Sequence, residues 1–459
     1  MEQQQPNKFL KWNKTSTTAR MMMIGFLSLV LLIPLVFIEN LIQERSLRQE
    51  KVLDEISKQW GNEVVIYGPI IKVPYKVFVE KVITDKKTKK ITTETIEYIK
   101  DGYFFPDKLD IKSTINPEQK KRGIYTTPVF NSNILINGTF NSFDFSQKEI
   151  DDKNILWDKS LVLLKTTNVK GVNSVLSINI DGKKHGLSSS GTNSYNDDRY
   201  YTLKSGMIPL KVENKKMKPV TFSLDFSVRG SKEIRFIPIG KETTAEISSS
   251  WKTAKFMGEF LPYNSDKIND HGFNAKWNIL DINRPFSQQH FNQLPYLNDF
   301  DFGVNFKIPV DEYQKSERSA KYGFLVICLT FLVFFLIQTI SKIYMHPFQY
   351  LMIGLALLMF YTLLVSISEH SNFLKAYAIA SISVIGLITA YAKNILKSLK
   401  FMLFIASSLT VLYAFIFIII QLESYALLAG SLGLFFILAA VMFVSRKIDW
   451  SIISLLNLI

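Results

Sequence analysis

The sequence predicts a membrane protein with an N-terminal anchor helix, a large all-β, sandwich-like domain outside the cytoplasm, and a C-terminal bundle of five transmembrane α-helices. Three observations lead to this fold class. The last third of the chain is nearly continuous Leu, Ile, Phe and Val, whereas the middle is rich in Lys, Asp, Asn and Thr. Short β-type runs fill that polar middle. Basic residues recur at alternate ends of the apolar runs, as they do when they mark the cytoplasmic side of a membrane.

The N-terminus carries the first membrane crossing. Residues 1–20 contain several basic residues and precede an apolar run, which resembles a signal sequence. No small-x-small cleavage site follows, so we interpret 1–20 as a cytoplasmic tail and 21–43 as an uncleaved first transmembrane helix. Pro34 lies inside this helix, where a membrane protein tolerates it with a kink.

Residues 44–320 are expected to form the extracytoplasmic, β-rich domain. After a charged helix, short runs of β-branched and aromatic residues alternate with turn residues up to about residue 309, which is typical of an all-β sandwich or related fold. Two β subdomains that meet near residues 151–154 are an open alternative. We expect few helices here, with one short turn in "TINPEQKKRG" and a surface hairpin in the Lys- and Thr-rich stretch 81–100.

Residues 321–459 are expected to form the five-helix transmembrane domain. Each apolar run is close to the roughly 20 residues that a helix needs to cross a hydrocarbon core. Together with the anchor they make six crossings, and the basic loops then fall on one side, with the N-terminus cytoplasmic and the large domain periplasmic. The runs lie at about 322–340, 348–367, 376–392, 401–420 and 425–444.

The sequence offers no catalytic, cofactor-binding or metal-binding residues that we would assign. Glu369 and His370 form the sharpest polar pair; they could bind a metal or transfer protons, but we favour an interfacial helix end. His346 starts the same apolar run, so it lies about a membrane away from them. The motif H-E-x-x-H is absent. The small residues of "GSLG" at 430–433 favour a helix contact over an intramembrane serine protease.

Other polar residues in the apolar runs are expected to be structural. Cys328 is the single cysteine, so no intrachain disulfide can form, and we expect it to be packed or lipid-facing. The net charge of +14 is attributed to membrane flanks, and no nucleic-acid partner is expected. Interhelical hydrogen bonds are expected from four residues, namely Gln338, Ser407, Ser408 and Thr410.

Two further groups of residues suggest packing contacts. A dense set of aromatic residues is expected to be core, with an exposed ligand platform as the alternative. Charges that flank the first and second crossings could pair across the two connections, Arg45 with Glu317 or Glu44 with Arg318, or could each lie among lipid headgroups. The aromatic set comprises Trp251, Phe256, Phe260, Phe273 and Trp277.

Nearly the whole chain resembles the CreD family of bacterial inner-membrane proteins. The most specific pieces are "HPFQYLMIGLALLMFYTLLVSISEH" at 346–370 and "PVDEYQKSERSAKYG" at 309–323. Further matching pieces are "LLIPLVFIENLIQER", "GPIIKVPY", "RGIYTTPVF", "GKETTAEISSSW", "MGEFLPY" and "GFNAKW". The resemblance implies a multi-pass protein of the bacterial inner membrane that is linked to cell-envelope integrity, and it supplies no catalytic residues.

Two functions follow from these observations. The first is a non-enzymatic envelope protein that supports envelope integrity or an envelope-stress response, whose periplasmic β domain binds a protein, glycan or lipid partner. The alternative is a transporter or channel-like protein for a lipid or amphiphile, with the β domain as its receptor. A polar, water-lined path through the crossings would favour the transporter, and carboxylates are nearly absent from the apolar runs. The lipid bilayer is the one partner that both functions require, and neither requires a cofactor.

The topology can be tested by cysteine labelling of intact cells. An impermeant reagent added from outside should modify Ser188→Cys and Ser371→Cys, because both positions are expected to be periplasmic. Ser341→Cys and Ser398→Cys should stay unlabelled until the cells are opened. Labelling of these last two variants in intact cells would contradict the predicted six crossings.

Overall fold

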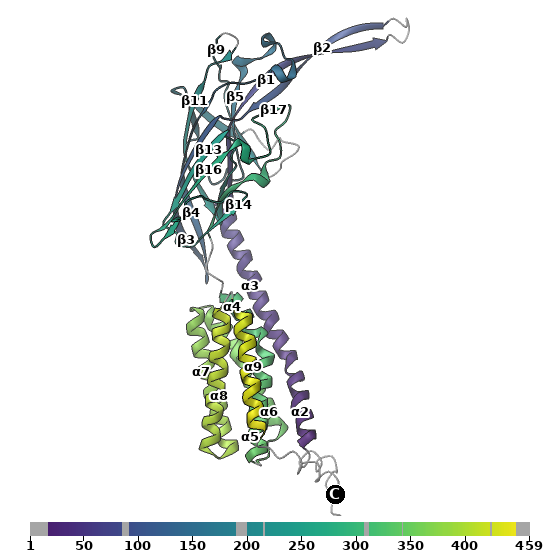
Figure 1. Cartoon of the computed structure of the whole chain (residues 1–459), viewed down its shortest axis with the longest axis vertical. Coiled ribbons are helices and arrows are strands. Elements are labelled where there is room, and N and C mark those ends of the chain that lie inside the picture. The colour runs from purple at the N-terminus through teal and green to yellow at the C-terminus, as the bar shows by residue number, and fades with distance from the viewer. Residues whose placement is uncertain are drawn as a thin grey trace, which may run out of the picture. The chain divides into compact units, whose positions relative to one another are not determined.

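The computed structural model of the chain divides by its contacts into two compact units (Figure 1). The helical unit comprises Met1–Lys51 and Val310–Ile459, and the β unit comprises Val52–Pro309. The structure describes residues 17–84, 91–189, 200–213, 216–306, 312–341, 343–422 and 425–446.

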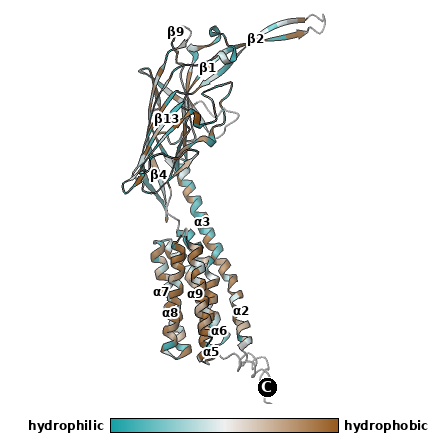
Figure 2. Ribbon diagram, viewed as in Figure 1, coloured by the Kyte–Doolittle hydropathy of each residue, from teal (hydrophilic) through white to brown (hydrophobic). Residues whose placement is uncertain are grey.

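Six helices in the described part of the chain are long and apolar enough to cross a membrane. The first is formed by α2 (Thr17–Val30) and α3 (Leu32–Trp60), and the amphipathic α4 (Glu312–Lys321) precedes the second. Figure 2 shows the change along α3 from apolar to polar residues. The predicted anchor and five-helix domain are therefore confirmed. The remaining helices are α5 (Gly323–Ser341), α6 (Pro347–Ser368), α7 (Phe373–Leu396), α8 (Leu399–Gln421) and α9 (Ala426–Ser445).

The first crossing is interrupted where Pro34 requires it. Pro34 has no N–H to donate to the carbonyl of Val30, four residues earlier, and the helix breaks at Leu31 between α2 and α3. The neighbouring hydrogen bonds persist, because the N–H of Leu31 donates to Leu27 O at 3.0 Å and that of Leu35 to Leu31 O at 3.3 Å. The α4 helix groups with the helical unit by its contacts, although residues 312–320 belong to the segment expected outside the membrane.

The β unit is built on one large sheet, which confirms the predicted all-β fold. Sixteen strands of the described residues join it in the order β14-β18-β12-β1-β5-β8-β7-β6-β11-β4-β3-β13-β16-β15, with β2 between β1 and β17. The longer strands are β1 (Val64–Thr84), β2 (Ile91–Phe104), β3 (Lys108–Arg122), β4 (Tyr125–Phe140), β11 (Val220–Ser231), β13 (Glu242–Ser249) and β16 (Gly272–Leu280). The shorter ones are β5 (Leu161–Thr166), β6 (Ser177–Ile180), β7 (Lys183–Ser189), β8 (Tyr201–Ser205), β12 (Glu233–Phe236), β14 (Ala254–Gly258), β15 (Ile268–Asn269), β17 (Gln289–Phe291) and β18 (Phe302–Phe306), and β9 (Val212–Glu213) pairs with β10 (Lys216–Met217) apart from the sheet.

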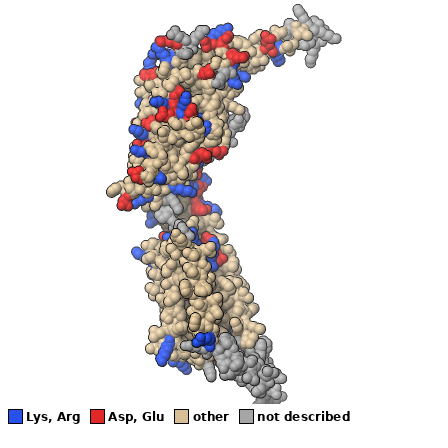
Figure 3. Space-filling view, viewed as in Figure 1, with Lys and Arg blue, Asp and Glu red and all other residues tan. Residues whose placement is uncertain are grey.

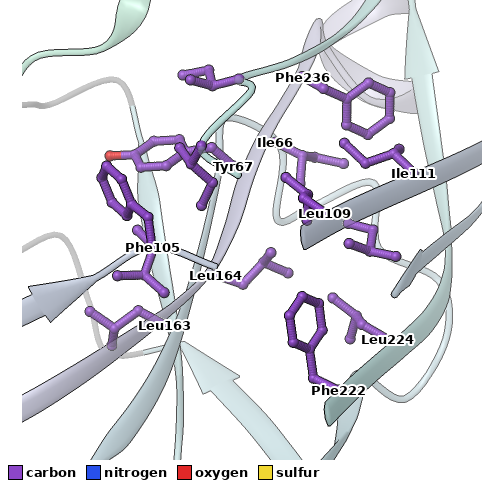
Figure 4. Packing of buried hydrophobic residues seen from close by; sticks show 14 of the residues in the cluster. Ile66, Tyr67, Phe105, Leu109, Ile111, Leu163, Leu164, Phe222, Leu224 and Phe236 are labelled. Atoms are coloured by element: carbon purple, nitrogen blue, oxygen red, sulfur yellow. The ribbon is translucent and has the colours of Figure 1, made fainter. Parts of the chain in front are cut away.

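The sheet curls until its two ends nearly meet. Phe256 of β14, at one end of the strand order, packs edge-to-face on Phe273 and Trp277 of β16 at the other, with ring centroids 6.0 and 6.1 Å apart. One hydrophobic core fills the interior, and Figure 4 shows part of it, contributed by strands far apart in the sequence. Two β subdomains are therefore not present, and residues 152–154 form only a single 3-10 turn at the surface of this one unit.

Two local expectations have different outcomes. The stretch "TINPEQKKRG" does not hold the expected turn over most of its length, because it continues β3 to Arg122 and turns only at Gly123. Its proline is accommodated because β13 pairs with β3 only up to Ile115, so Pro117 lies on a strand with β4 as its single neighbour. The expected hairpin at 81–100 is present, since β1 and β2 pair up to Thr84 and Ile91; the connecting residues 85–90 lie outside the described residues.

The expected aromatic core is confirmed at its centre. Trp277 is 2% exposed and its indole N–H donates to the carbonyl of Phe260 at 3.0 Å, and Phe273 is also buried. Trp251, Phe256 and Phe260 are half-buried against the same core. These side chains are therefore packed, and they do not form an exposed platform.

This difference in burial predicts unequal effects of two tryptophan substitutions. Trp277→Ala should lower the free energy of unfolding of the β unit by about 3–5 kcal/mol, because it leaves a large cavity. Trp251→Ala should cost about 1–2 kcal/mol, because that ring is already partly exposed. Pulse proteolysis of the full chain in increasing urea measures both values. Equal midpoints for Trp277→Ala and the wild type would contradict this assignment of the core.

Candidate functional site

The described residues contain no group of three or more His, Cys, Asp and Glu side chains that could hold a metal ion. The side chains of the candidate metal or proton-transfer pair, Glu369 and His370, lie in different environments. Glu369 is turned into the helical unit and its side chain is 15% exposed, whereas His370 is exposed to solvent.

The start of α6 is a helix cap. The Nδ1 atom of His346 accepts the backbone N–H of Phe348 at 3.2 Å, and the side chain of Gln349 accepts the N–H of His346 at 2.9 Å. Pro347 stands at the first helical position, where a missing N–H has no cost. His346 therefore has a complete structural role at this end of the helix.

The other end of α6 joins three further helices. A carboxylate oxygen of Glu369 accepts the hydroxyl of Tyr313 on α4 at 3.0 Å and lies 3.8 Å from Nε of Arg45 on α3. On the same side, the carboxylate of Glu312 accepts the N–H of Phe373, the first residue of α7, at 2.8 Å. We call Arg45, Glu312, Tyr313 and Glu369 the helix-end cluster; it connects α3, α4, α6 and α7.

This cluster replaces the charge pairs that the sequence suggested. Arg45 lies beside Glu369 instead of Glu317, which pairs with Lys321 one turn along α4 at 3.0 Å. Sequence analysis missed the Glu369 contacts because its partners are about 56 and 324 residues away along the chain. The only sequence feature that pointed to these contacts was the position of the Glu369 carboxylate at the end of an apolar run.

Hydrogen bonding between the crossings is only partly as expected. Gln338 of α5 accepts the buried hydroxyl of Tyr350 on α6 at 2.7 Å, which confirms one interhelical bond. Ser407 and Thr410 instead donate to carbonyls of their own helix, Phe404 O and Ala406 O. In the 430–433 segment, a Cβ on Gly433 would meet the Phe415 ring of α8 at 2.0 Å, so this glycine is a close helix contact.

The β unit carries its most unusual surface on a two-stranded ribbon. Residues 76–84 of β1 pair one-to-one with residues 91–99 of β2, and neither segment has another strand partner among the described residues. The ribbon projects from the body of the β unit (Figure 1). Its nine pairs would extend about 30 Å at the usual rise per residue. Because no third strand lies beside it among the described residues, the ribbon presents two open backbone edges. A two-stranded ribbon without further partners is only marginally stable in water.

The ribbon also exposes large apolar side chains on both of its faces. Phe78, Val82 and Ile99 share one face and Val79, Ile83 and Tyr98 the other, because directly opposed residues of an antiparallel pair point the same way. Charged residues of both signs separate them, as in the pair Lys76–Glu97 at 2.9 Å. The exposed apolar residues are Phe78 50%, Val79 46%, Val82 62%, Ile83 40%, Ile91 68%, Tyr98 49% and Ile99 61%. Clustered exposure of this kind marks an interaction surface more often than isolated exposed residues do.

A buried ion cluster lies where β1 begins. Arg235 of β12 contacts Asp301 at 2.6 Å, Glu233 at 2.5 Å and Glu63 at 3.6 Å, and its side chain is 13% exposed. Burial raises the pKa of Glu233, and the adjacent Arg235 opposes that rise. One guanidinium thus holds carboxylates from three segments, so we assign the cluster to the stability of this end of the unit.

The helix-end cluster can be tested by substitution. Glu369→Ala should lower the free energy of unfolding by about 1–3 kcal/mol, because it leaves the Tyr313 hydroxyl and Arg45 without their shared acceptor. The control Glu317→Ala removes only a partly exposed pair on one helix and should cost less than about 1 kcal/mol. Thermal unfolding of the purified full chain gives the comparison. Equal losses in the two variants would show that the cluster adds no stability of its own.

Comparison with known proteins assigns the chain to a family. The family model described as "Inner membrane protein CreD" matches residues 16–451. The inner membrane protein CreD of Escherichia coli (strain K12) is 28% identical over 437 residues, which cover 93% of this chain and 92% of that protein. Matching of nearly the whole length includes both the helical unit and the β unit. The chain is therefore a multi-pass inner-membrane protein that belongs to the CreD family.

Proposed function

We propose that this protein supports cell-envelope integrity or an envelope-stress response by binding another envelope protein, without catalysing a reaction. The observation that carries the proposal is the β1–β2 ribbon, with open edges and exposed apolar side chains on both faces. In this proposal the N-terminus is cytoplasmic and the β unit periplasmic. The basic residues at one end of the crossings, Lys393, Lys397, Lys400 and Arg446, support that orientation.

A protein fits the ribbon better than a lipid does. An added strand would satisfy the unpaired N–H and C=O groups along either edge, which hydrocarbon cannot do. Alternating apolar and charged side chains on each face, including the pair Lys76–Glu97, match a groove of mixed character. The partner is therefore expected to add a strand to the ribbon and to cover Phe78 or Tyr98 at the same time.

The ribbon is well placed within the β unit to reach a partner. The first and last strands of the β unit lie together where β1 begins, because α3 ends just before β1 and β18 pairs with β12, which pairs with Val64–Ile66 of β1. The ribbon lies at the other end of the same strand. The 21 residues of β1 allow a separation of up to about 65 Å along the strand.

The alternative, a transporter for a lipid or amphiphile, has less support. The central turns of α5, α6, α8 and α9 contain no Asp, Glu, Lys or Arg, and no charged side chain lines the two cavities beside α5, α7, α8 and α9. A path for a charged or polar substrate normally contains ionisable groups at mid-membrane. We therefore retain the transporter only as a second possibility that needs an apolar substrate.

The binding proposal is tested by photocrosslinking in living cells. A benzoyl-phenylalanine at Ile99, on the ribbon, should give a discrete crosslinked protein, and adding Val82→Asp on the same face should abolish it. The same probe at Ile282, which is 85% exposed but lies outside the ribbon, is the control and should give no such product. Crosslinks to phospholipid alone, or identical products from both positions, would contradict a protein partner on the ribbon.

A further inference from the structure

An apolar cavity lies between three of the crossings. It has a volume of about 520 Å³ and is lined by α5, α8 and α9. Apart from Thr330, Ser407 and Ser408, the lining side chains are aliphatic or aromatic, and the hydroxyl of Thr330 is buried without a hydrogen-bond partner among the described residues. A cavity of this size falls within the range of small-ligand sites, and its lining suits a hydrocarbon chain.

The cavity runs along the middle of the crossings and reaches close to one end of α9. Its lining runs from Phe404 to Phe415 on α8 and from Gly433 to Val444 on α9. Eleven residues of helix correspond to about 17 Å, whereas the whole hydrocarbon core measures about 30 Å. The cavity therefore accommodates most of an acyl chain that starts near the end of α9 and extends past the middle of α8.

The cavity is accessible from the lipid side. Phe404, Val411 and Phe436 line it and are nevertheless exposed, with 47%, 68% and 65% of their surface accessible. No residue of α9 is buried, although this helix is as apolar as its neighbours. Among the described residues α9 is therefore incompletely packed, which leaves contacts that membrane hydrocarbon can complete.

The end of the cavity that contains Phe404 and Val444 is positively charged. Lys400 lies one turn before Phe404 on α8, and Arg446 follows Val444 at the end of α9. Both are exposed, and neither forms an ion pair with another described residue. The first turn of α8 has no side-chain cap, so its N–H groups add to the positive potential there. Figure 3 shows basic side chains gathered at this end of a largely uncharged helical surface.

We propose that α5, α8 and α9 bind an anionic phospholipid. One acyl chain lies in the cavity, and the phosphate headgroup lies between Lys400 and Arg446 at the ends of α8 and α9. The acyl chain would then fill the space between the helices and stabilise the packing of α9 against α5 and α8. The proposal does not depend on the ribbon or on its partner, so each can fail without the other.

Native mass spectrometry of the purified full chain tests this site. Phosphatidylglycerol and phosphatidylethanolamine with identical acyl chains are supplied in equal amounts, and the bound fraction of each is measured. The wild type should prefer phosphatidylglycerol, and Lys400→Gln with Arg446→Gln should reduce that preference about fivefold for each cation removed. Lys375→Gln with Arg318→Gln removes two charges near the opposite helix ends and should leave the preference unchanged.

A second pair of variants tests the cavity itself. Ala440→Phe places a ring in the cavity and should abolish binding of both lipids, whereas Ala439→Phe, at the adjacent position outside the lining, should not. Undiminished phosphatidylglycerol binding in Ala440→Phe, or an unchanged preference after removal of Lys400 and Arg446, would overturn the proposal. A lipid-free dimer crosslinked through Ala440→Cys would overturn it too, because a second copy would then cover the cavity. The charge variants alter only exposed side chains, so their result decides the question even if Ala440→Phe fails to fold.

Discussion

The β unit depends on how the end of α3 is fixed to the start of β1. Two cations lie over the Trp60 ring, with Nζ of Lys120 4.1 Å and the guanidinium carbon of Arg229 5.2 Å from its centroid, and the indole N–H donates to the carbonyl of Phe130 at 3.4 Å. Gly61 follows with φ of +148°, and a Cβ there would meet the carbonyl oxygen of Arg229 at 2.6 Å. Helix therefore changes to strand across a residue that only glycine can occupy without strain.

The residues after this junction fix the register of β1. Ser231 donates its hydroxyl to Gly61 O at 2.8 Å, and the Asn168 amide donates to Asn62 O and Arg229 O. Strand β1 then lies between β12 and β5 before it continues outward with β2 as the ribbon. One strand thus joins the helix junction to the proposed binding surface, so a partner on the ribbon would act on a strand whose other end is joined to α3 through residues 61–63.

Sequence patterns predicted those features of the fold that are determined by residues close together in the chain. The crossings were predictable because twenty apolar residues in a row are a local signal, and the β content was predictable from short β-branched runs. The parallel pairing of β1 with β12 and of β3 with β13 joins residues well over a hundred positions apart, and no periodicity specifies it. That pairing is also what makes one nearly closed sheet out of the two subdomains left open by the sequence.

The candidate surfaces were harder to predict for the same reason. The stretch 81–100 was recognisable as a surface hairpin, but its open edges become evident only when no third strand is found beside Val82 or Ile99. Glu369 was recognised as a polar helix end, yet its role depends on Tyr313 and Arg45 from other helices. Both candidate surfaces therefore depend on non-local structure: the Glu369 cluster on contacts between distant helices, and the ribbon on the lack of a third strand among the described residues.

The most direct test of the account removes the ribbon and measures the envelope. Residues 79–96 are replaced by Asn-Gly, which can form a tight turn between the directly paired Phe78 and Glu97 and leaves the body of the sheet intact. Uptake of a dye normally excluded by the envelope is then compared in cells with the full chain, the shortened chain and no chain. If the account is right, the shortened chain reaches the inner membrane in normal amounts, yet uptake is as high as without the chain. Dye exclusion equal to that of the full chain would contradict the central role of the ribbon.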